Sequence, residues 1–219
     1  FQRMTYRHAM DTYGTDKPDT RYQMHIEKLT DLDSFIENKE VSVRMLRVPG
    51  KGNELSKKKI EKLCEDVNLS LKRTNENRIV SVVAVKVEEG VNWGRVVMAG
   101  PTENALFLIK KGNDEYKTKI LQSVGARSGD LLICAVGIGD DPCEALGYVR
   151  STFGPDFMTE DEKHKLDFLW ITDFPMFEVG ANQKLKCSHH PFTMPNAEDT
   201  VALRDYANKG NSIDGLLQI

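Results

Sequence analysis

FLWITDFPMFEVGANQKLKCSHHPFTMP, residues 168–195, is the stretch from which the fold of this chain can be read outward. Residues 168–171 form an apolar run of aromatic and β-branched side chains, which is typical of a strand buried on both faces. Pro175 cannot donate to a central β-ladder, so the strand is interrupted there or lies at an edge. The polar segment 180–186 begins with glycine and predicts a hairpin connection. We therefore predict two extended segments, one on either side of this connection, that pair in antiparallel fashion.

Two adjacent histidines end the second extended segment, and Pro191 holds His190 in an extended conformation. Neighbouring residues of a strand point to opposite faces, so His189 and His190 share a pocket only if the backbone is irregular there. Two interpretations remain open: one packed and one surface histidine, or a site that uses histidine as a switchable donor. A metal site is disfavoured, because Cys187 is too close in sequence to the histidines for tetrahedral geometry and the chain has no CxxC pair.

The composition is that of a globular protein of one or two domains. The chain has 219 residues, of which 40% are hydrophobic and 29% charged, with a net charge of −3. This charge provides no overall basic surface, so any contact with nucleic acid has to be local. Four widely spread cysteines predict reduced thiols in an intracellular protein. No apolar stretch approaches the roughly 20 residues of a membrane span, and a start that resembles neither a signal peptide nor an initiator Met suggests part of a longer chain.

The preceding residues alternate between helical and strand patterns. We predict a helix after Thr5, a strand at 41–48, a helix capped by Ser56, a Val-rich strand at 79–87, a helix over 102–124, a strand at 131–136 and a helix from Pro142. Loops are expected at 49–53, 90–101 and 153–166, and a short helix or turn before residue 41. Residues 26–160 thus read as a compact α+β or α/β domain of ordinary size, without a GxSxG, HExxH or Rossmann GxGxxG signature.

Two charged segments allow a structural and a binding interpretation. The turn TDKPDTR contains Lys17 and Arg21, which either belong to a solvated loop or clamp a phosphate or carboxylate. Lys57 to Lys59 lie outward on the helix capped by Ser56, where they form a solvated face or touch an RNA backbone.

The two ends of the chain resemble the bacterial-type aspartyl-tRNA synthetases, a class II family that includes mitochondrial members. The resemblance rests on FQRMTYRHAMDTYGTDKPDTRY at 1–22 and on FLWITDFPMFE and HHPFTMP within 168–195. In that family these segments lie between motifs 2 and 3 of the catalytic domain and flank the inserted GAD domain. The resemblance implies an α+β fold, with a compact GAD-like α/β insertion domain at 26–165. Residues 1–25 and 166–219 would be its flanks, contributing strands of the antiparallel catalytic sheet.

The family performs ATP-dependent activation of L-aspartate and its transfer to the 3′ end of tRNA, with Mg²⁺ assisting at the phosphates. By similarity, His189 contacts the bound aspartate, and His190 supports it or the adenylate pocket. The residues expected to contact tRNA are Lys57, Lys58, Lys59, Lys110 and Lys111. A homodimeric parent enzyme without membrane contact, in the bacterial cytoplasm or the mitochondrial matrix, is implied as well.

The chain also departs from the family pattern. Motifs 2 and 3 and the anticodon-binding barrel are not present, and residues 196–219 match the family's continuation poorly. We therefore expect this chain to hold neither ATP nor Mg²⁺ and to form no aspartyl-adenylate alone. The alternatives are a non-catalytic tRNA-binding or protein-interaction module derived from the insertion domain, and an unrelated α+β domain with structural histidines.

Overall fold

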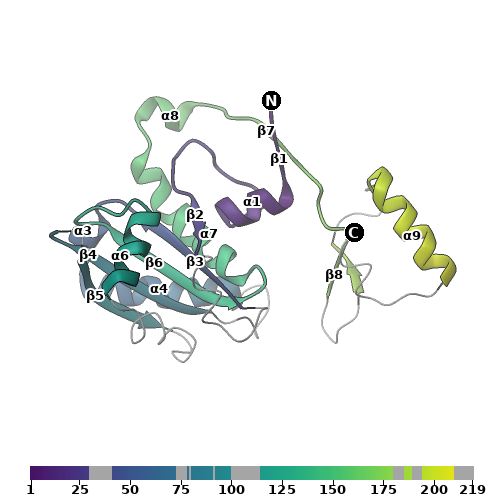
Figure 1. The fold of residues 1–219 in the computed structure, drawn as a ribbon. Helices are drawn as coiled ribbons and strands as arrows, with labels where there is room; N and C mark the ends of the chain where they lie inside the picture. Colours follow the sequence, from purple (N-terminus) through teal and green to yellow (C-terminus); the bar gives the residue numbers. More distant parts are fainter. Residues whose placement is uncertain are drawn as a thin grey trace. The chain divides into compact units, whose positions relative to one another are not determined.

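The computed structural model describes residues 1–29, 41–72, 78, 80–90, 92–99, 114–179, 185–188 and 194–209 (Figure 1). The chain forms two compact units. The smaller unit consists of Phe1–Arg7 and Leu169–Ile219, and the larger unit is His8–Phe168. The larger unit is thus inserted in the sequence of the smaller one. This division into units does not test the domain boundaries expected from the sequence, 26 and 165, which therefore stay a prediction.

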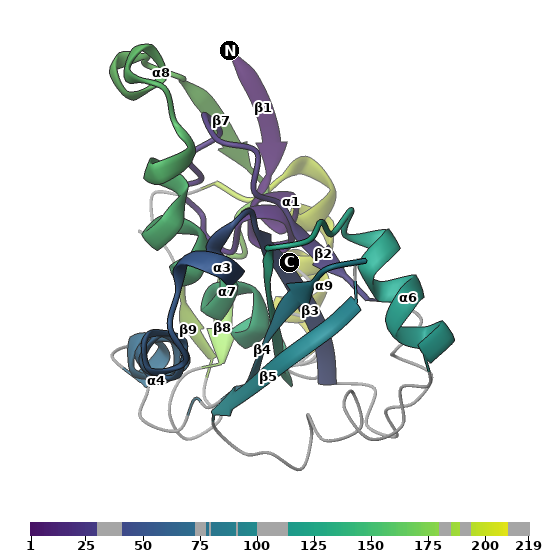
Figure 2. The same ribbon diagram turned by 90° about the vertical axis from the view of Figure 1, so that its left-hand side faces the viewer.

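A five-stranded antiparallel sheet forms the centre of the larger unit (Figure 2). Its order is β2 (Ile26–Lys28), β3 (Val41–Val48), β6 (Leu131–Ile138), β4 (Ser81–Glu88) and β5 (Asn92–Ala99). The central strand β6 pairs antiparallel with both β3 and β4, so these two run in the same direction on either side of it. The fold is therefore α+β, as the sequence predicts, and the sheet of the larger unit is antiparallel throughout.

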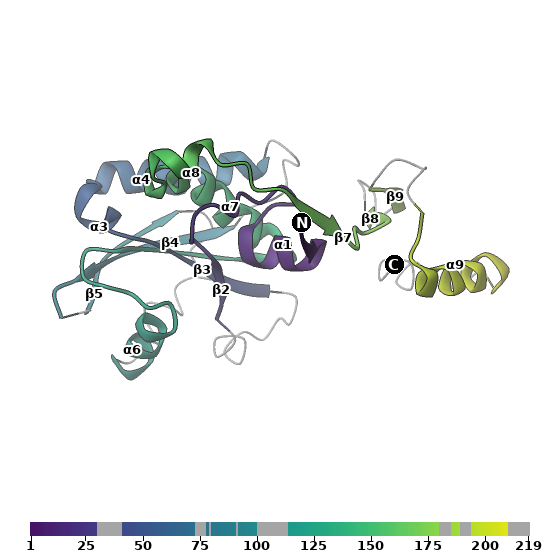
Figure 3. The ribbon, with the colours of Figure 1, turned by 90° about the horizontal axis from the view of Figure 1, so that it is seen from above.

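Helices cover both faces of this sheet (Figure 3). On one face, α4 (Lys57–Lys72) buries the predicted stripe of Ile60, Leu63, Cys64, Val67 and Leu71. Beside it, α7 (Asp141–Phe153) begins with a proline in its first turn and adds Ala145, Leu146 and Val149 to the same core. On the other face, α6 (Asp114–Ser123) contributes Ile120 and Leu121. The predictions for α4 and α7 are confirmed, because their periodic apolar residues are those that the sheet buries.

Several predicted connections are regular structure instead. The strand β5 replaces most of the loop expected at 90–101, because Gly90, with φ 75°, turns the chain back along β4. The strand β2 stands where a short helix or turn was expected, and α3 (Lys51–Glu54) lies within the expected loop. The expected connection at 153–166 contains the 3₁₀ helix η1 (Gly154–Phe157) and α8 (Glu160–His164). The last has a capping box, in which the Thr159 hydroxyl accepts from the Glu162 amide.

The smaller unit contains two pairs of strands. β1 (Gln2–Thr5) pairs in parallel with β7 (Leu169–Thr172), and α1 (Tyr6–Tyr13) follows β1 directly. β8 (Phe177–Val179) and β9 (Leu185–Cys187) form the predicted antiparallel hairpin, and α9 (Ala197–Lys209) follows. The prediction that 168–171 is buried on both faces is wrong, since Phe168 and Trp170 are 62% and 59% exposed. Within the described residues, β7 has the short strand β1 as its one partner, which is too little to cover it.

Candidate functional site

The β8–β9 hairpin leads directly to the predicted substrate-binding residues. His189 and His190 themselves lie outside the described residues. The hairpin pairs Phe177 with Cys187, and beyond this pair the Ser188 amide donates to the Met176 carbonyl at 3.0 Å. The backbone up to the residue before His189 is therefore held by β8 and by Met176, which precedes it.

The turn between β7 and β8 contains a residue in the left-handed region. Asp173 has φ 57° and is the one non-glycine residue with positive φ in the described part of the chain. Its two carboxylate oxygens accept hydrogen bonds from the Thr172 hydroxyl at 2.9 Å and the Asn196 side-chain amide at 3.0 Å. Backbone strain that is held in place by side chains often marks a functional element. The sequence shows here only that Thr172-Asp173 interrupts an apolar run, and that pattern does not reveal a left-handed residue.

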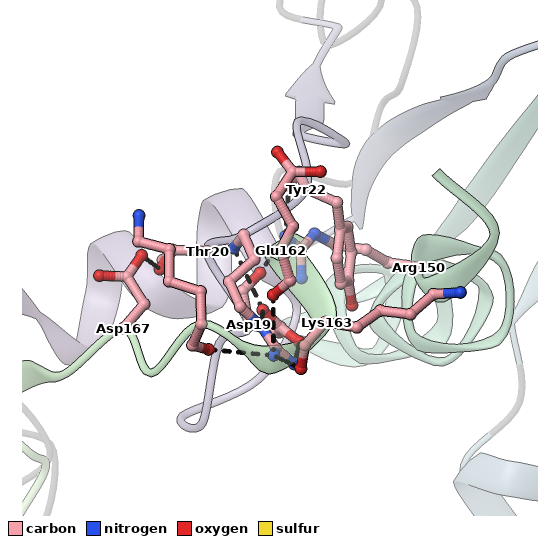
Figure 4. A network of polar contacts seen from close by, with 9 residues as sticks. Asp19, Thr20, Tyr22, Arg150, Glu162, Lys163 and Asp167 are labelled. Atoms are coloured by element: carbon pink, nitrogen blue, oxygen red, sulfur yellow. Dashed lines mark hydrogen bonds and ion pairs between the residues drawn. The ribbon is translucent and has the colours of Figure 1, made fainter. Parts of the chain in front are cut away.

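The TDKPDTR turn binds other parts of the protein (Figure 4). Arg21 donates from Nε and Nη2 to the two carboxylate oxygens of Asp19, at 2.9 and 2.7 Å. Its Nη1 lies 3.3, 2.9 and 3.2 Å from the carbonyl oxygens of Glu162, Lys163 and Lys165. Each nitrogen of Arg21 thus has a protein acceptor, which favours the structural interpretation of this turn over a phosphate or carboxylate clamp. Bonding to Arg21 is also the main reason why the pKa of the Asp19 carboxyl is lowered.

Arg150 on α7 holds the same turn from inside the larger unit. Its side chain is buried between the rings of Tyr13 and Tyr22, whose centroids lie 4.6 and 4.2 Å from the guanidinium carbon. Nε donates to the Met24 carbonyl at 2.6 Å, and Nη2 donates to the carbonyls of Asp19 and Tyr22 at 2.6 and 3.2 Å. Burial lowers the pKa of Arg150, and these carbonyls and aromatic faces replace the water that the cation has lost.

A further hydrogen bond joins the two connecting segments, from the Thr20 hydroxyl to the Asp167 carboxylate at 2.8 Å. We call Asp19, Thr20, Arg21, Arg150 and Asp167, with the carbonyls they bind, the clasp. It fastens the segment after α1 to α7 and to the segment around α8. All of these residues belong to the larger unit. The clasp therefore has a structural role, since its bonds hold segments of the larger unit together.

A local basic surface lies at the start of α4. Lys57, Lys58 and Lys59 are exposed, and the first turn of α4 has no acidic side chain. Their charges therefore add to the partial positive charge of the helix N-terminus. Lys86 lies near this end, since its Nζ donates to the Leu55 carbonyl at 2.7 Å. Lys57 pairs with Glu61 at 3.2 Å across exposed side chains. Lys110 and Lys111, predicted to act with these lysines, lie outside the described residues.

The thiols offer little chemistry in the larger unit. Burial raises the pKa of Cys64 and of Cys134 to about 12 and also raises that of Cys143, so these thiols stay protonated. Cys187 on β9 is exposed. Across the described ranges, no three His, Cys, Asp or Glu side chains gather as metal ligands would. None of the helices in these ranges is both long enough and apolar enough to cross a membrane.

Comparisons with known proteins place similarity along almost the whole chain. The family model of tRNA synthetases class II (D, K and N) matches residues 1–217. This match includes most of residues 196–219, for which the sequence motifs gave only a poor resemblance to the family. An aspartate–tRNA ligase of Halalkalibacterium halodurans is 34% identical over 93% of this chain and 32% of its own length.

Other relatives agree with this match. An aspartate–tRNA ligase of Limosilactobacillus fermentum is 35% identical over 94% of this chain and 33% of its own length. An aspartate–tRNA(Asp/Asn) ligase of Brachyspira hyodysenteriae is 30% identical over 98% of this chain and 36% of its own length. The chain spans about a third of the length of these curated relatives.

Proposed function

Because the chain belongs to the class II tRNA synthetases of the D, K and N group, we propose that it is part of an aspartate–tRNA ligase. The observation that carries this proposal is the similarity to proteins named aspartate–tRNA ligase, at 34–35% identity over more than nine-tenths of the chain. The parent enzyme would use ATP to activate L-aspartate and would transfer the aspartyl group to the 3′ end of tRNA.

In this enzyme His189 would contact the aspartate substrate, with His190 in support. A protonated imidazole beside a substrate carboxylate supplies a charge-assisted hydrogen bond. The hairpin supports this role, because Ser188 is paired with Met176 and gives His189 a fixed starting point. ATP would bind to residues of the remaining enzyme. Among the described residues, no cluster of side chains fits a magnesium site.

Residues 26–165, which lie within the larger unit, would be the GAD-like insertion domain, and its basic surface would meet tRNA. Lys57 to Lys59 are exposed at a helix N-terminus without acidic neighbours in the first turn, which favours a phosphate backbone as partner. Lys110 and Lys111 would extend this contact. A homodimeric parent, in the bacterial cytoplasm or the mitochondrial matrix, is proposed from the family resemblance alone.

One observation favours a second candidate, a non-catalytic tRNA-binding or protein-interaction module. The five-stranded sheet and the two apolar cores lie entirely within the larger unit, so this unit has what an independent module needs.

Aspartate-dependent ATP–pyrophosphate exchange tests the proposal. We expect exchange by the parent enzyme and none by the 219-residue chain alone, with His189→Ala in the parent raising KM for aspartate more than KM for ATP. Exchange by the chain alone would show that it holds a complete site. A parent without exchange that still binds tRNA would support the module instead.

A further inference from the structure

Asp173 connects the end of one strand with the start of one helix. One carboxylate oxygen accepts from the hydroxyl of Thr172, the last residue of β7, at 2.9 Å. The other accepts from the side-chain amide of Asn196, the residue before α9, at 3.0 Å. Both oxygens are therefore used within the smaller unit, by partners that are 1 and 23 positions from Asp173 along the chain.

Asn196 belongs to the start of α9. Its carbonyl accepts from the amide and from the hydroxyl of Thr200, each at 3.0 Å, which is the first hydrogen-bonded turn of α9. The bond from Asn196 to Asp173 therefore joins the β7–β8 turn to a helix.

The backbone at Asp173 redirects the chain toward the hairpin. Asp is one of the few non-glycine residues that tolerate a φ of 57°, because its short carboxylate can bond locally. The next residue, Phe174, places its ring 5.2 Å from that of Tyr6, and Pro175 then fixes its own φ. Met176, which follows, accepts the hydrogen bond from Ser188. The direction in which the hairpin leaves β7 is thus set within the residues from Thr172 to Met176.

We propose that Asp173 is a positioning residue for the binding of L-aspartate, which acts through the β8–β9 hairpin without touching the substrate. The inference rests on the proposed function, in which the hairpin continues into the aspartate-binding histidine. The side-chain bonds of Asp173 hold the left-handed turn to the start of α9. They thereby keep the hairpin in its binding position. Neither the family motif nor the spacing of residues assigned a role to this carboxylate.

Steady-state ATP–pyrophosphate exchange in the full parent enzyme tests this role, with KM measured separately for aspartate and ATP. Asp173→Ala and Asn196→Ala each remove the bond between the turn and α9, and each should raise KM for aspartate at least about fivefold. KM for ATP should change by less than about twofold, because ATP is proposed to bind to residues of the remaining enzyme. Asp173→Asn keeps the left-handed preference and one acceptor oxygen for the Asn196 amide, while its own amide can donate to the Thr172 hydroxyl, and it should restore KM for aspartate. Glu198→Gln removes an exposed carboxylate two residues after Asn196 and serves as the matched control.

Equal increases of both KM values, or a normal KM for aspartate in Asn196→Ala, would overturn the inference. If Asp173→Ala fails to fold, Asp173→Gly decides, since glycine accepts the positive φ but has no side chain to hold. We expect Asp173→Gly to raise KM for aspartate, and a wild-type value would show that the carboxylate has no positioning role. A wild-type parent without aspartate-dependent exchange refutes the proposed function and this inference together, whereas unchanged variants of an active parent refute the inference alone.

Discussion

Arg150 is a charged residue at a position of α7 that faces the protein interior. A buried guanidinium is stable only when its donors find acceptors, and here the acceptors are backbone carbonyls of the segment from Asp19 to Met24. The same segment provides Tyr22, whose ring covers one side of the guanidinium. A single residue thus fixes a loop that has no regular secondary structure of its own.

The pairing of Asp19 with Arg21 should make part of the stability depend on pH. The pKa of Asp19 is lowered in the folded state, so its contribution is present above the ordinary Asp pKa of about 3.9 and is lost as the pH falls through the folded value. Because Asp19 is partly exposed, we expect Asp19→Asn to lower the free energy of unfolding at pH 7 by no more than about 1.5 kcal/mol.

Thermal unfolding of the chain from pH 7 to pH 3 measures this effect, and the gap between wild type and Asp19→Asn should narrow below about pH 4. Asp16→Asn is the control, since Asp16 pairs only loosely with Lys17, at 3.6 Å, and the Lys17 side chain is 87% exposed. Equal effects of the two substitutions would show that the bond to Arg21 contributes nothing.

At the scale of elements, α1 and α7 meet through two glycines. A Cβ atom on Gly14 would lie 2.1 Å from the Cys143 carbonyl oxygen, and one on Gly147 would lie 2.3 Å from the Gly14 carbonyl oxygen. Gly14 also has φ 69° and ends α1, with its amide donating to the Met10 carbonyl at 3.0 Å. The approach of the two backbones therefore requires glycine on both sides.

We expect Gly14→Ala to destabilise the chain by more than about 3 kcal/mol, because it adds a backbone clash to the strain of a positive φ. Gly147→Ala should have a similar effect from the clash alone. Gly125→Ala is the matched control: Gly125 has φ 59° but open space around its Cβ position, so the loss should be about 1 kcal/mol. Urea denaturation of the three variants separates clash from strain, and a loss for Gly147→Ala as small as that of Gly125→Ala would contradict the close packing.

The exposed lysines at the start of α4 are predicted to bind tRNA. Replacing Lys57, Lys58 and Lys59 by Glu in the parent enzyme should weaken tRNA binding and should flatten its salt dependence by about one unit of slope for each lost phosphate contact. Lys119→Glu, an exposed change on α6 at the opposite face of the sheet, is the control. Filter binding between roughly 50 and 300 mM salt compares the two, and an unchanged slope in the triple variant would exclude this surface.

The two units differ in the size of their buried apolar core. Both apolar clusters belong to the larger unit, and the described part of the smaller unit has two pairs of short strands, α9 and the start of α1. Residues 8–168 alone should therefore unfold cooperatively on heating and resist limited proteolysis. Residues 169–219 alone should be cleaved rapidly, because isolated two-stranded sheets are only marginally stable. A rapidly degraded larger unit would show that it needs the smaller one to fold.

The parts of the fold that follow from local periodicity could be predicted, and those that depend on distant backbone could not. The stripe of α4 is readable because five buried residues recur at helical spacing. The strand β5 could not be predicted from its residues for two reasons. It contains Gly94, where a Cβ would lie 2.4 Å from the Glu88 side chain, and its register with β4 is irregular between Val85 and Val87. The acceptors of Arg150 are carbonyl groups, which every residue has, so no sequence pattern points to them. The same is true of Asp173, whose partner Asn196 lies 23 positions away.

The clasp has a consequence for the order in which the chain folds. The pairing of β1 with β7 joins residues such as Thr5 and Thr172, which are 167 positions apart in sequence, and an open loop of that length is costly to close. Once the clasp has joined Thr20 to Asp167, the loop that remains is roughly eightfold shorter. This lowers the entropic free-energy cost of closing it by about 2 kcal/mol. On the ribosome, β1 emerges long before its partner and has to wait for the inserted unit to form. The inserted unit would then act as an internal template for assembly, bringing together two strands that the chain alone keeps apart.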